Sequence, residues 1–295
     1  MRLTDDDIAV IRHVAAHRFL RSTHVVSLLQ RPSKKVLERL AALYHNGYLD
    51  RPRAQLDYYA TAGSAPLVYA LGNKGAALLA QQDGTKFPKV DWTWKNRDAG
   101  RVFIEHTLLV ADLMVAIETA TKRARTISLI DAAEMLKGAP ASTQKAKNPW
   151  ALPARIVHGG MRYDLSLIPD KLFGLDYLDL RKRSYFFVEA DRGTMPVTRS
   201  HPRQTSFQQK ILGYLAGSRP VNTHAQHFGI GNFRVLTVTT TRERIATMVA
   251  ALKAVTNGTG SNQFLFVDRA SLLASPDVLS LDWTSGKSEI VRLRL

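Results

Sequence analysis

The feature that most constrains this chain of 295 residues is an apolar strand that contains two acids. A helix that carries a lysine follows this strand. The strand-like run YFFVEADRGT contains Glu189 and Asp191, and residues two apart on a strand share one face. Carboxylates on an aromatic face are unfavourable unless they are paired or bound to a cation. The run therefore predicts a metal site or an ion pair inside an α/β fold.

Further side chains can join these acids. Asp170 is expected to close the preceding strand, and the helix FQQKILGYLAG places Lys210 and Tyr214 one turn apart. Carboxylate oxygens suit Mg²⁺ or Mn²⁺, and a metal between Asp170 and Glu189 would polarise a phosphate oxygen and activate water. This pattern predicts a metal-dependent phosphodiesterase. Lys210 would stabilise the developing charge, Asp191 would be a ligand or base, and Tyr214 would position Lys210 or contact the phosphate.

A structural explanation fits the same residues equally well. Asp191, Arg192 and Gly193 can form a turn, and Glu189 can form a surface salt bridge. Spacing alone does not separate this explanation from the catalytic one.

Residues 1–90 predict a winged-helix domain. Thr4 precedes three aspartates, which is typical of a helix start, and further helices are expected to begin at Ser22 and at a cap on Ser33. A turn-rich basic stretch, the strand LVYAL and a closing helix follow. In a winged helix the third helix enters the DNA major groove and the wing contacts the backbone.

Basic side chains occupy the expected third helix and wing. A solvated helix face would explain the helical ones, but their place ahead of a basic wing favours DNA contact. The predicted DNA-binding residues are Lys34, Lys35, Arg39, Arg51 and Arg53, and Tyr58 and Tyr59 lie in the same stretch.

Residues 91–295 alternate strands with helices and predict an α/β domain after a linker over residues 83–95. Residues 138–160 look irregular, and a loop of that length is usually functional or mobile. The expected strands cover residues 162–168, 185–191, 234–240 and 264–268, and the expected helices cover residues 98–121, 203–216 and 242–255, with a short one near Ser271.

Composition points to a polyanionic partner. The net charge is +16, with 13 Lys and Arg against 7 Asp and Glu in residues 1–90 and 28 against 18 in residues 91–295. Such a field attracts nucleic acid or an anionic membrane surface. No apolar run is long enough for a membrane span, the N-terminus lacks signal-peptide character, and cysteine is absent, so we expect a cytoplasmic protein.

Several motifs together resemble the replication-relaxation family of plasmids and conjugative elements. They are EHTLLVADL, IPDKLF, FFVEADRGT and QKILGYLAG, and the resemblance covers most of residues 4–217. It implies a second domain similar to PD-(D/E)XK nucleases, with a mixed central sheet. Asp170 would match the PD acid and Glu189 the first acid of the second motif.

The chain departs from the nuclease pattern at Asp191, where lysine is expected. The resemblance implies that Lys210 replaces that lysine from the helix, and that Lys210 and Tyr214 match the Q-x-x-x-Y helix of RecB-like nucleases. His106 would match a metal-ligating histidine, although it also fits the apolar stripe of a core helix.

The leading hypothesis is therefore a mobile-element protein that binds double-stranded DNA and carries a nuclease-like domain, which would cut DNA with Mg²⁺ or Mn²⁺. The alternative is a non-catalytic accessory or regulatory factor that retains the fold, and a third, RNA processing, rests on charge alone. Winged helices often dimerise, so a homodimer is an expectation without support from a heptad pattern.

Overall fold

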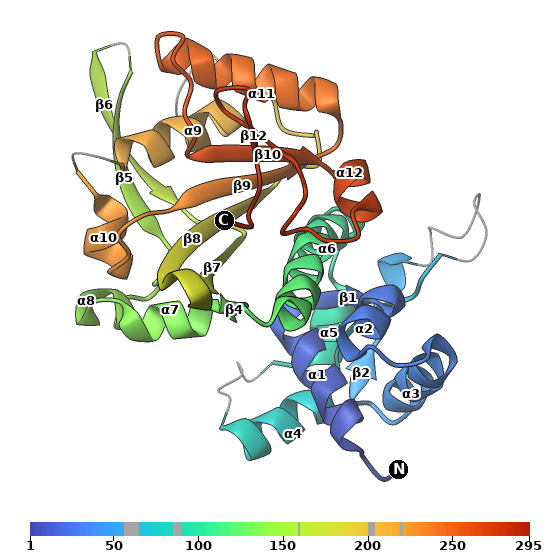
Figure 1. Ribbon diagram of the computed structural model, residues 1–295. Coiled ribbons are helices and arrows are strands. Elements are labelled where there is room, and N and C mark those ends of the chain that lie inside the picture. Colours follow the sequence, from blue (N-terminus) through green and yellow to red (C-terminus); the bar gives the residue numbers. More distant parts are fainter. Residues whose placement is uncertain (56–64, 85–89, 159, 200–203, 219–220) are drawn as a thin grey trace. The chain divides into compact units, whose positions relative to one another are not determined.

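The chain forms two compact units, Met1–Val115 and Ala116–Leu295, in a computed structural model (Figure 1). The model describes all residues except 56–64, 85–89, 159, 200–203 and 219–220. The boundary between the units falls inside helix α6 (Arg101–Ala124), later in the chain than the domain boundary that we expected at residue 90.

The first unit begins with α1 (Asp5–His17), where the Thr4 side chain accepts from the Asp7 amide and the Asp7 carboxylate accepts from the Thr4 amide. This reciprocal cap satisfies two amides that a helix start leaves without partners. The elements that follow before α6 are β1 (Phe19–Arg21), α2 (Ser22–Leu29), α3 (Ser33–His45), β2 (Leu49–Asp50), β3 (Val68–Leu71), α4 (Asn73–Asp83) and α5 (Trp92–Arg97).

The strands of the first unit form an antiparallel sheet in the order β1-β3-β2. Some details differ from expectation. α3 follows Pro32, so Ser33 is its first residue rather than its cap, and residues 92–97 form α5 instead of a linker. Tyr58 and Tyr59 lie outside the described residues.

The second unit is built on a mixed sheet of seven strands in the order β12-β11-β10-β9-β8-β7-β4, which confirms the expected α/β class with a mixed central sheet. β8, β9 and β10 run parallel, and the outer neighbours pair antiparallel. The strands are β4 (Ile127–Ile130), β7 (Lys171–Tyr177), β8 (Lys182–Ala190), β9 (Arg234–Thr239), β10 (Phe264–Asp268), β11 (Trp283–Ser285) and β12 (Ile290–Val291).

Two further strands, β5 (Leu152–His158) and β6 (Met161–Leu167), form a separate antiparallel ribbon. The helices of the second unit after α6 are α7 (Ala132–Gly138), α8 (Ala141–Gln144), the 3₁₀ helix η2 (Leu178–Leu180), α9 (Phe207–Ala216), α10 (Thr223–Phe228), α11 (Arg242–Val255) and α12 (Arg269–Ala274).

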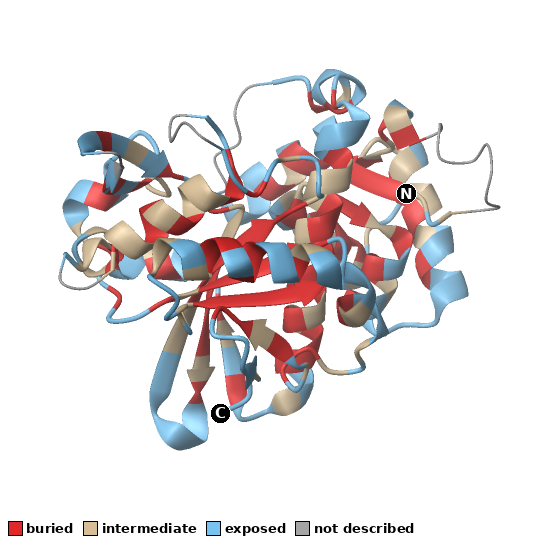
Figure 2. Cartoon of the chain, turned by 90° about the horizontal axis from the view of Figure 1, so that it is seen from above, coloured by how far each residue is buried: buried red, intermediate tan, exposed pale blue. Residues whose placement is uncertain are grey.

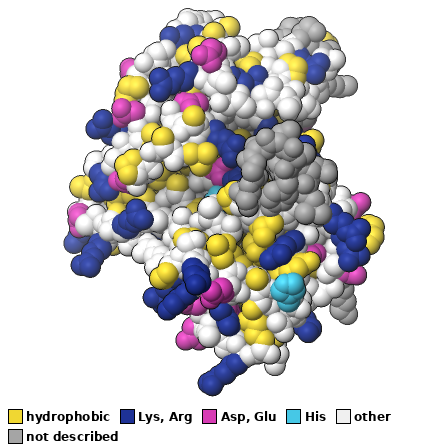
Figure 3. All heavy atoms as spheres, turned by 90° about the vertical axis from the view of Figure 1, so that its right-hand side faces the viewer, with side chains coloured by type: hydrophobic (Ala, Val, Ile, Leu, Met, Phe, Trp, Pro, Cys, Tyr) yellow, Lys and Arg dark blue, Asp and Glu magenta, His cyan; other side chains and the backbone are white. Residues whose placement is uncertain are grey.

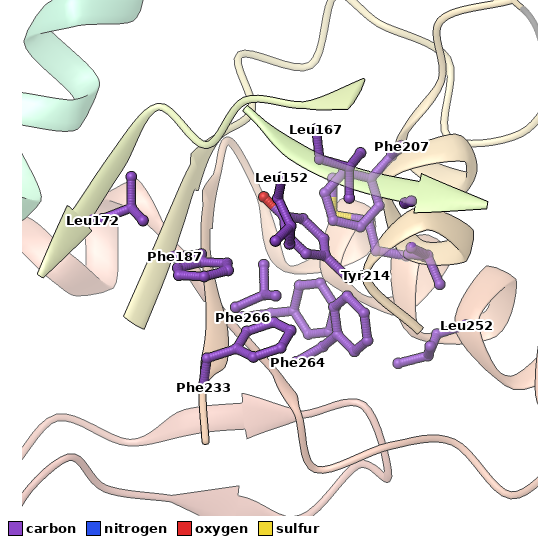
Figure 4. Close-up of a cluster of buried hydrophobic side chains, with 14 of the residues drawn as sticks. Leu152, Leu167, Leu172, Phe187, Phe207, Tyr214, Phe233, Leu252, Phe264 and Phe266 are labelled. Carbon is purple, nitrogen blue, oxygen red and sulfur yellow. The ribbon is translucent and has the colours of Figure 1, made fainter. Parts of the chain in front are cut away.

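The core of the second unit lies between α9, α11 and one face of the sheet. Phe187, Phe264 and Phe266 are fully buried there, and Tyr214 lies among them (Figure 4). Because side chains alternate along a strand, the same face also receives Glu189. Figure 2 shows the central strands of the seven-stranded sheet as buried, whereas helices have exposed positions. In the described parts of the chain, no helix is both long and apolar enough to cross a bilayer.

Three predictions about this unit were wrong. Residues 138–160, expected to be irregular, contain α8 and β5. β4 and β7 were not anticipated, and β7 changes the setting of Asp170, which precedes this strand instead of closing the one before it.

Candidate functional site

Asp170 and Glu189 are brought together by the pairing of β7 with β8. The Asp170 amide donates to the Val188 carbonyl at 3.0 Å, and Asp170 Oδ2 accepts from the Ala190 amide at 2.8 Å. Asp170 is therefore fixed to the backbone on both sides of Glu189. This neighbourhood follows from strand pairing and not from local sequence.

α9 supplies the partners of Glu189. Ser206 caps the helix by accepting from the Gln209 amide, and Lys210 and Tyr214 lie one turn apart on the side that faces the sheet. Tyr214 donates from Oη to Glu189 Oε1 at 2.6 Å, and Lys210 Nζ forms an ion pair with Oε2. Both oxygens of this buried carboxylate therefore have partners.

Burial and charge perturb the whole group. Burial raises the pKa of Glu189; the positive charge of Lys210 opposes this rise, and the charge of Asp170 adds to it. Burial disfavours the charged form of Lys210, but Glu189 and Asp170 outweigh burial and raise its pKa. Burial, reinforced by the charge of Glu189, raises the pKa of Tyr214 well above its ordinary value. Such mutual perturbation of ionisable groups is typical of functional sites.

Asp191 has a different set of partners. Arg244 on α11 donates from Nη2 to Oδ1 at 2.8 Å and from Nε to Oδ2, while the Thr239 hydroxyl donates to Oδ2 at 2.6 Å. The Gly193 amide also donates to Oδ2, so the expected Asp-Arg-Gly turn is present. Glu189, in contrast, is buried and forms no surface salt bridge. Sequence reasoning missed Arg244, because no local spacing links residues so far apart.

Two threonines of β9 differ in the same way as the two acids. Thr237 pairs in register with Glu189 and is fully buried, and within the described residues its hydroxyl has no hydrogen-bond partner. Thr239, two residues on, donates to Asp191. A buried hydroxyl without a partner lowers stability. The threonine beside Glu189 is therefore in an unfavourable environment, whereas the threonine beside Asp191 is hydrogen-bonded.

The donor set fits a hard divalent cation. Asp170 and Glu189 offer carboxylate oxygens at adjacent positions, and the charge of each affects the other. Each oxygen of Glu189 accepts from one partner, Tyr214 or Lys210, and has a second lone pair that can bind a cation. Lys210 retains 27% of its side-chain surface, so it can leave Glu189 without entering an apolar environment.

His106, the third predicted metal ligand, lies on α6 in the first unit, whereas the acids lie in the second. Its side chain is half-buried. Its role as a ligand stays a prediction. Of the expected stripe on α6, Leu113 and Ile117 are buried, but Phe103 is exposed.

The predicted DNA-binding residues fall into two groups. Lys34, Lys35 and Arg53 are exposed. Arg39 forms an ion pair with Asp7, and Arg51 stacks on Tyr44 with its Cζ 4.2 Å from the ring centre and donates to the Tyr69 hydroxyl.

The exposed part of α3 contains one apolar residue, Leu37, which we expected to point inward. On the face shown in Figure 3, lysine and arginine side chains are spread among acids and do not gather in one patch.

Comparison with known proteins places these features in a family. A search of curated proteins finds no match. Among solved structures, MunI restriction endonuclease in complex with cognate DNA is similar over 66% of this chain and 87% of that one, at 10% identity and a TM-score of 0.27. The model of the replication-relaxation family matches residues 11–228. The chain thus belongs to the replication-relaxation family.

Proposed function

We propose that this protein binds double-stranded DNA of a plasmid or other mobile element and that its second unit is a PD-(D/E)XK nuclease-like domain that nicks or cleaves this DNA. The observation that carries the proposal is the group of half-buried Asp170, buried Glu189 and half-buried Lys210, in which two acids and an amine from different elements converge. Two acids that lie close together are unfavourable for stability, because each disfavours the charged form of the other. Their convergence therefore favours a functional explanation.

In this proposal Asp170 and Glu189 hold Mg²⁺ or Mn²⁺, and His106 remains a candidate third ligand. The metal would supply Lewis-acid polarisation of a phosphate oxygen and a bound water of lowered pKa. Lys210, released from Glu189, places a positive charge where negative charge develops on the phosphate. Tyr214 orients Glu189. We assign Asp191 to positioning, because both of its oxygens are held by Arg244 and Thr239.

The first unit would deliver the DNA. Its element order, with α3 followed by an antiparallel strand pair, supports a winged helix whose third helix enters the major groove. Lys34, Lys35 and Arg53 are exposed and available to phosphates. Arg39 and Arg51 already have protein partners, so they contribute by shaping the surface. A homodimer is compatible with this arrangement and is tested by measuring mass in solution.

The nuclease proposal is tested by incubating supercoiled plasmid with the full chain and Mg²⁺ or Mn²⁺. Asp170→Asn and Glu189→Gln should each reduce nicking by about a thousandfold or more, equivalent to roughly 4 kcal/mol of transition-state stabilisation. The matched control is Asp179→Asn, which removes an exposed acid of the same unit and should leave nicking unchanged. Equal nicking by all four proteins, or none by any, would reject catalysis.

A second candidate function is a non-catalytic DNA-binding accessory or regulatory factor with the same fold. Asp191 favours it, because this acid stands where the nuclease pattern has lysine and is held by Arg244. This candidate predicts salt-sensitive DNA binding with no metal requirement. Lys34→Gln with Lys35→Gln should then weaken binding with or without EDTA, while no protein nicks the plasmid.

A further inference from the structure

The β5–β6 ribbon is a structural element that neither the acidic site nor α3 explains. Its strands pair antiparallel from Leu152 opposite Leu167 to His158 opposite Met161, and it forms no ladder with the seven-stranded sheet. Figure 1 shows it as a long ribbon beside α9 and α10. Seven residues per strand give a length of roughly 23 Å.

One face of the ribbon is anchored to the core. Leu152, Ala154 and Leu167 are buried in the same cluster as α9. Leu167 packs so closely on Gly213 that a Cβ there would lie 2.8 Å from Leu167 Cδ1. Gly213 lies on α9 next to Tyr214, so the base of the ribbon is fixed to the helix that holds Glu189.

Among the described residues, the opposite face has no packing partner of comparable extent. Arg155 and Arg162 are exposed, and Arg155 pairs with the cross-strand Asp164, with side chains that keep 71% and 77% of their surface. Near the tip, Val157 and Met161 are 63% and 60% exposed. The outer face therefore presents Arg155 and Arg162 beside Val157, whereas Met161 is exposed at the tip on the same face as Tyr163.

The charge around the ribbon is mainly positive, although Asp164 on the outer face pairs with Arg155. The sequence from residue 135 to residue 163 contains no Asp or Glu, and the lysines and arginines in it are all exposed. In the rest of the second unit, acids are interspersed with bases. A segment that lacks acids is complementary to a polyanion and provides little attraction for a basic protein surface. The basic residues of this segment are Lys137, Lys145, Lys147, Arg155 and Arg162.

We propose that the outer face of the β5–β6 ribbon is a second contact surface for duplex DNA, in addition to α3. A two-stranded ribbon fits the major groove, and apolar side chains at the tip of such a ribbon contact bases or the groove floor. Arg155 and Arg162 bind phosphates on either side of the groove, and Val157, which pairs with Arg162 on the same face, points into it. The inference rests on the proposed DNA binding, and it specifies which part of the second unit holds the duplex near Glu189.

The test compares binding of a labelled duplex by the full chain and by the double variant Arg155→Gln/Arg162→Gln, using fluorescence anisotropy at several salt concentrations. The double variant should bind about tenfold more weakly, and the slope of log affinity against log salt should become shallower by about 1 to 2, as expected for the loss of two phosphate contacts. The control Lys182→Gln/Lys287→Gln removes the same charge from exposed positions elsewhere in this unit. It should keep most of the affinity.

The outcomes are separable. Equal weakening by both double variants would mean that only net charge matters and would overturn the ribbon proposal. Unchanged binding by Arg155→Gln/Arg162→Gln, with weakening by Lys34→Gln/Lys35→Gln, would overturn it while the proposed function stands, and would leave the apolar tip to a protein partner. No duplex binding by the wild type would reject the proposed function itself. Unchanged melting temperatures of the variants verify that they fold.

Discussion

Glu189 lies near the end of β8 and Asp191 directly follows this strand, and both are buried, yet their surroundings differ. Asp191 is held by the planar fork of Arg244 and by a threonine hydroxyl. Glu189 is held by a lysine and a tyrosine and has a second acid, Asp170, as its neighbour. A bidentate guanidinium fixes a carboxylate in one geometry, whereas an ammonium is a point charge on a flexible stem that can move away.

The difference matches the roles that we propose, in which Asp191 supports the fold and Glu189 binds the metal. Arg244 and Thr239 pair with both oxygens of Asp191, whereas burial and the charge of Asp170 raise the pKa of Glu189. Groups held in an unfavourable state are characteristic of functional sites, where stability is given up for activity. Four measurements can break or sharpen this contrast.

The largest expected effect is on stability. Asp191→Asn breaks a buried, bidentate ion pair and should lower the free energy of unfolding of the second unit by about 3 kcal/mol. Glu189→Gln keeps the hydrogen bond of Tyr214 and removes a charge that burial disfavours, so it should change that free energy by less than about 1 kcal/mol. Urea unfolding followed by circular dichroism measures both. Equal losses would show that the two acids are equally structural.

A divalent cation should bind at Glu189 and not at Asp191. Mn²⁺ at one hundred times its dissociation constant should stabilise the wild type by about 2.7 kcal/mol, which thermal melting detects as a raised Tm. Asp191→Asn, although less stable, should show the same rise, and Glu189→Gln should show little. A rise of equal size in Glu189→Gln would place the cation elsewhere.

Tyr214 gives a smaller effect with a defined pH dependence. Tyr214→Phe removes the hydrogen bond to Glu189 and should lower stability by about 1 kcal/mol at neutral pH. The pKa of Tyr214 is raised in the folded state, so its contribution is fully present below the ordinary tyrosine pKa of about 10 and is lost as pH rises above it. The gap between wild type and variant should therefore narrow above about pH 10. A constant gap up to pH 12 would contradict the assignment.

The smallest effect concerns the two threonines of β9. Thr239→Val removes the hydroxyl that donates to Asp191 and should lower stability by about 1 kcal/mol. Thr237→Val removes a buried hydroxyl that lacks a partner among the described residues, so it should leave stability unchanged or raise it by up to about 1 kcal/mol. The pair is matched in strand, burial and chemistry. Similar losses for both would indicate a partner for Thr237.

Local sequence predicted the regular elements well where their signals were strong. α11 and β10 lie at the residues expected, since an N-cap threonine and a short apolar run mark them clearly. β7 was missed because Gly174 interrupts its apolar run and a basic turn follows it. β5 was missed because Pro153 and its surroundings are typical of a loop, although a proline is tolerated on a ribbon that is not part of a larger sheet.

The candidate site was only partly predictable. Lys210 and Tyr214 share one face of α9 because of helical spacing, and the structure does bring both to Glu189. The partner of Asp191 could not be inferred, because Arg244 reaches it through packing of α11 on the sheet. The charge state of Glu189 likewise depends on burial by distant segments, which no local pattern encodes.

The independence of the β5–β6 ribbon from the seven-stranded sheet has a consequence for how this protein can diversify. Its outward residues take part in no ladder of the main sheet, so they can be exchanged without strain in the strands that carry the acids. Among relatives, we expect the outward residues of this ribbon, and with them the preferred DNA target, to vary more than the residues of the acidic site. Grafting the ribbon of one relative onto another should transfer the preference alone.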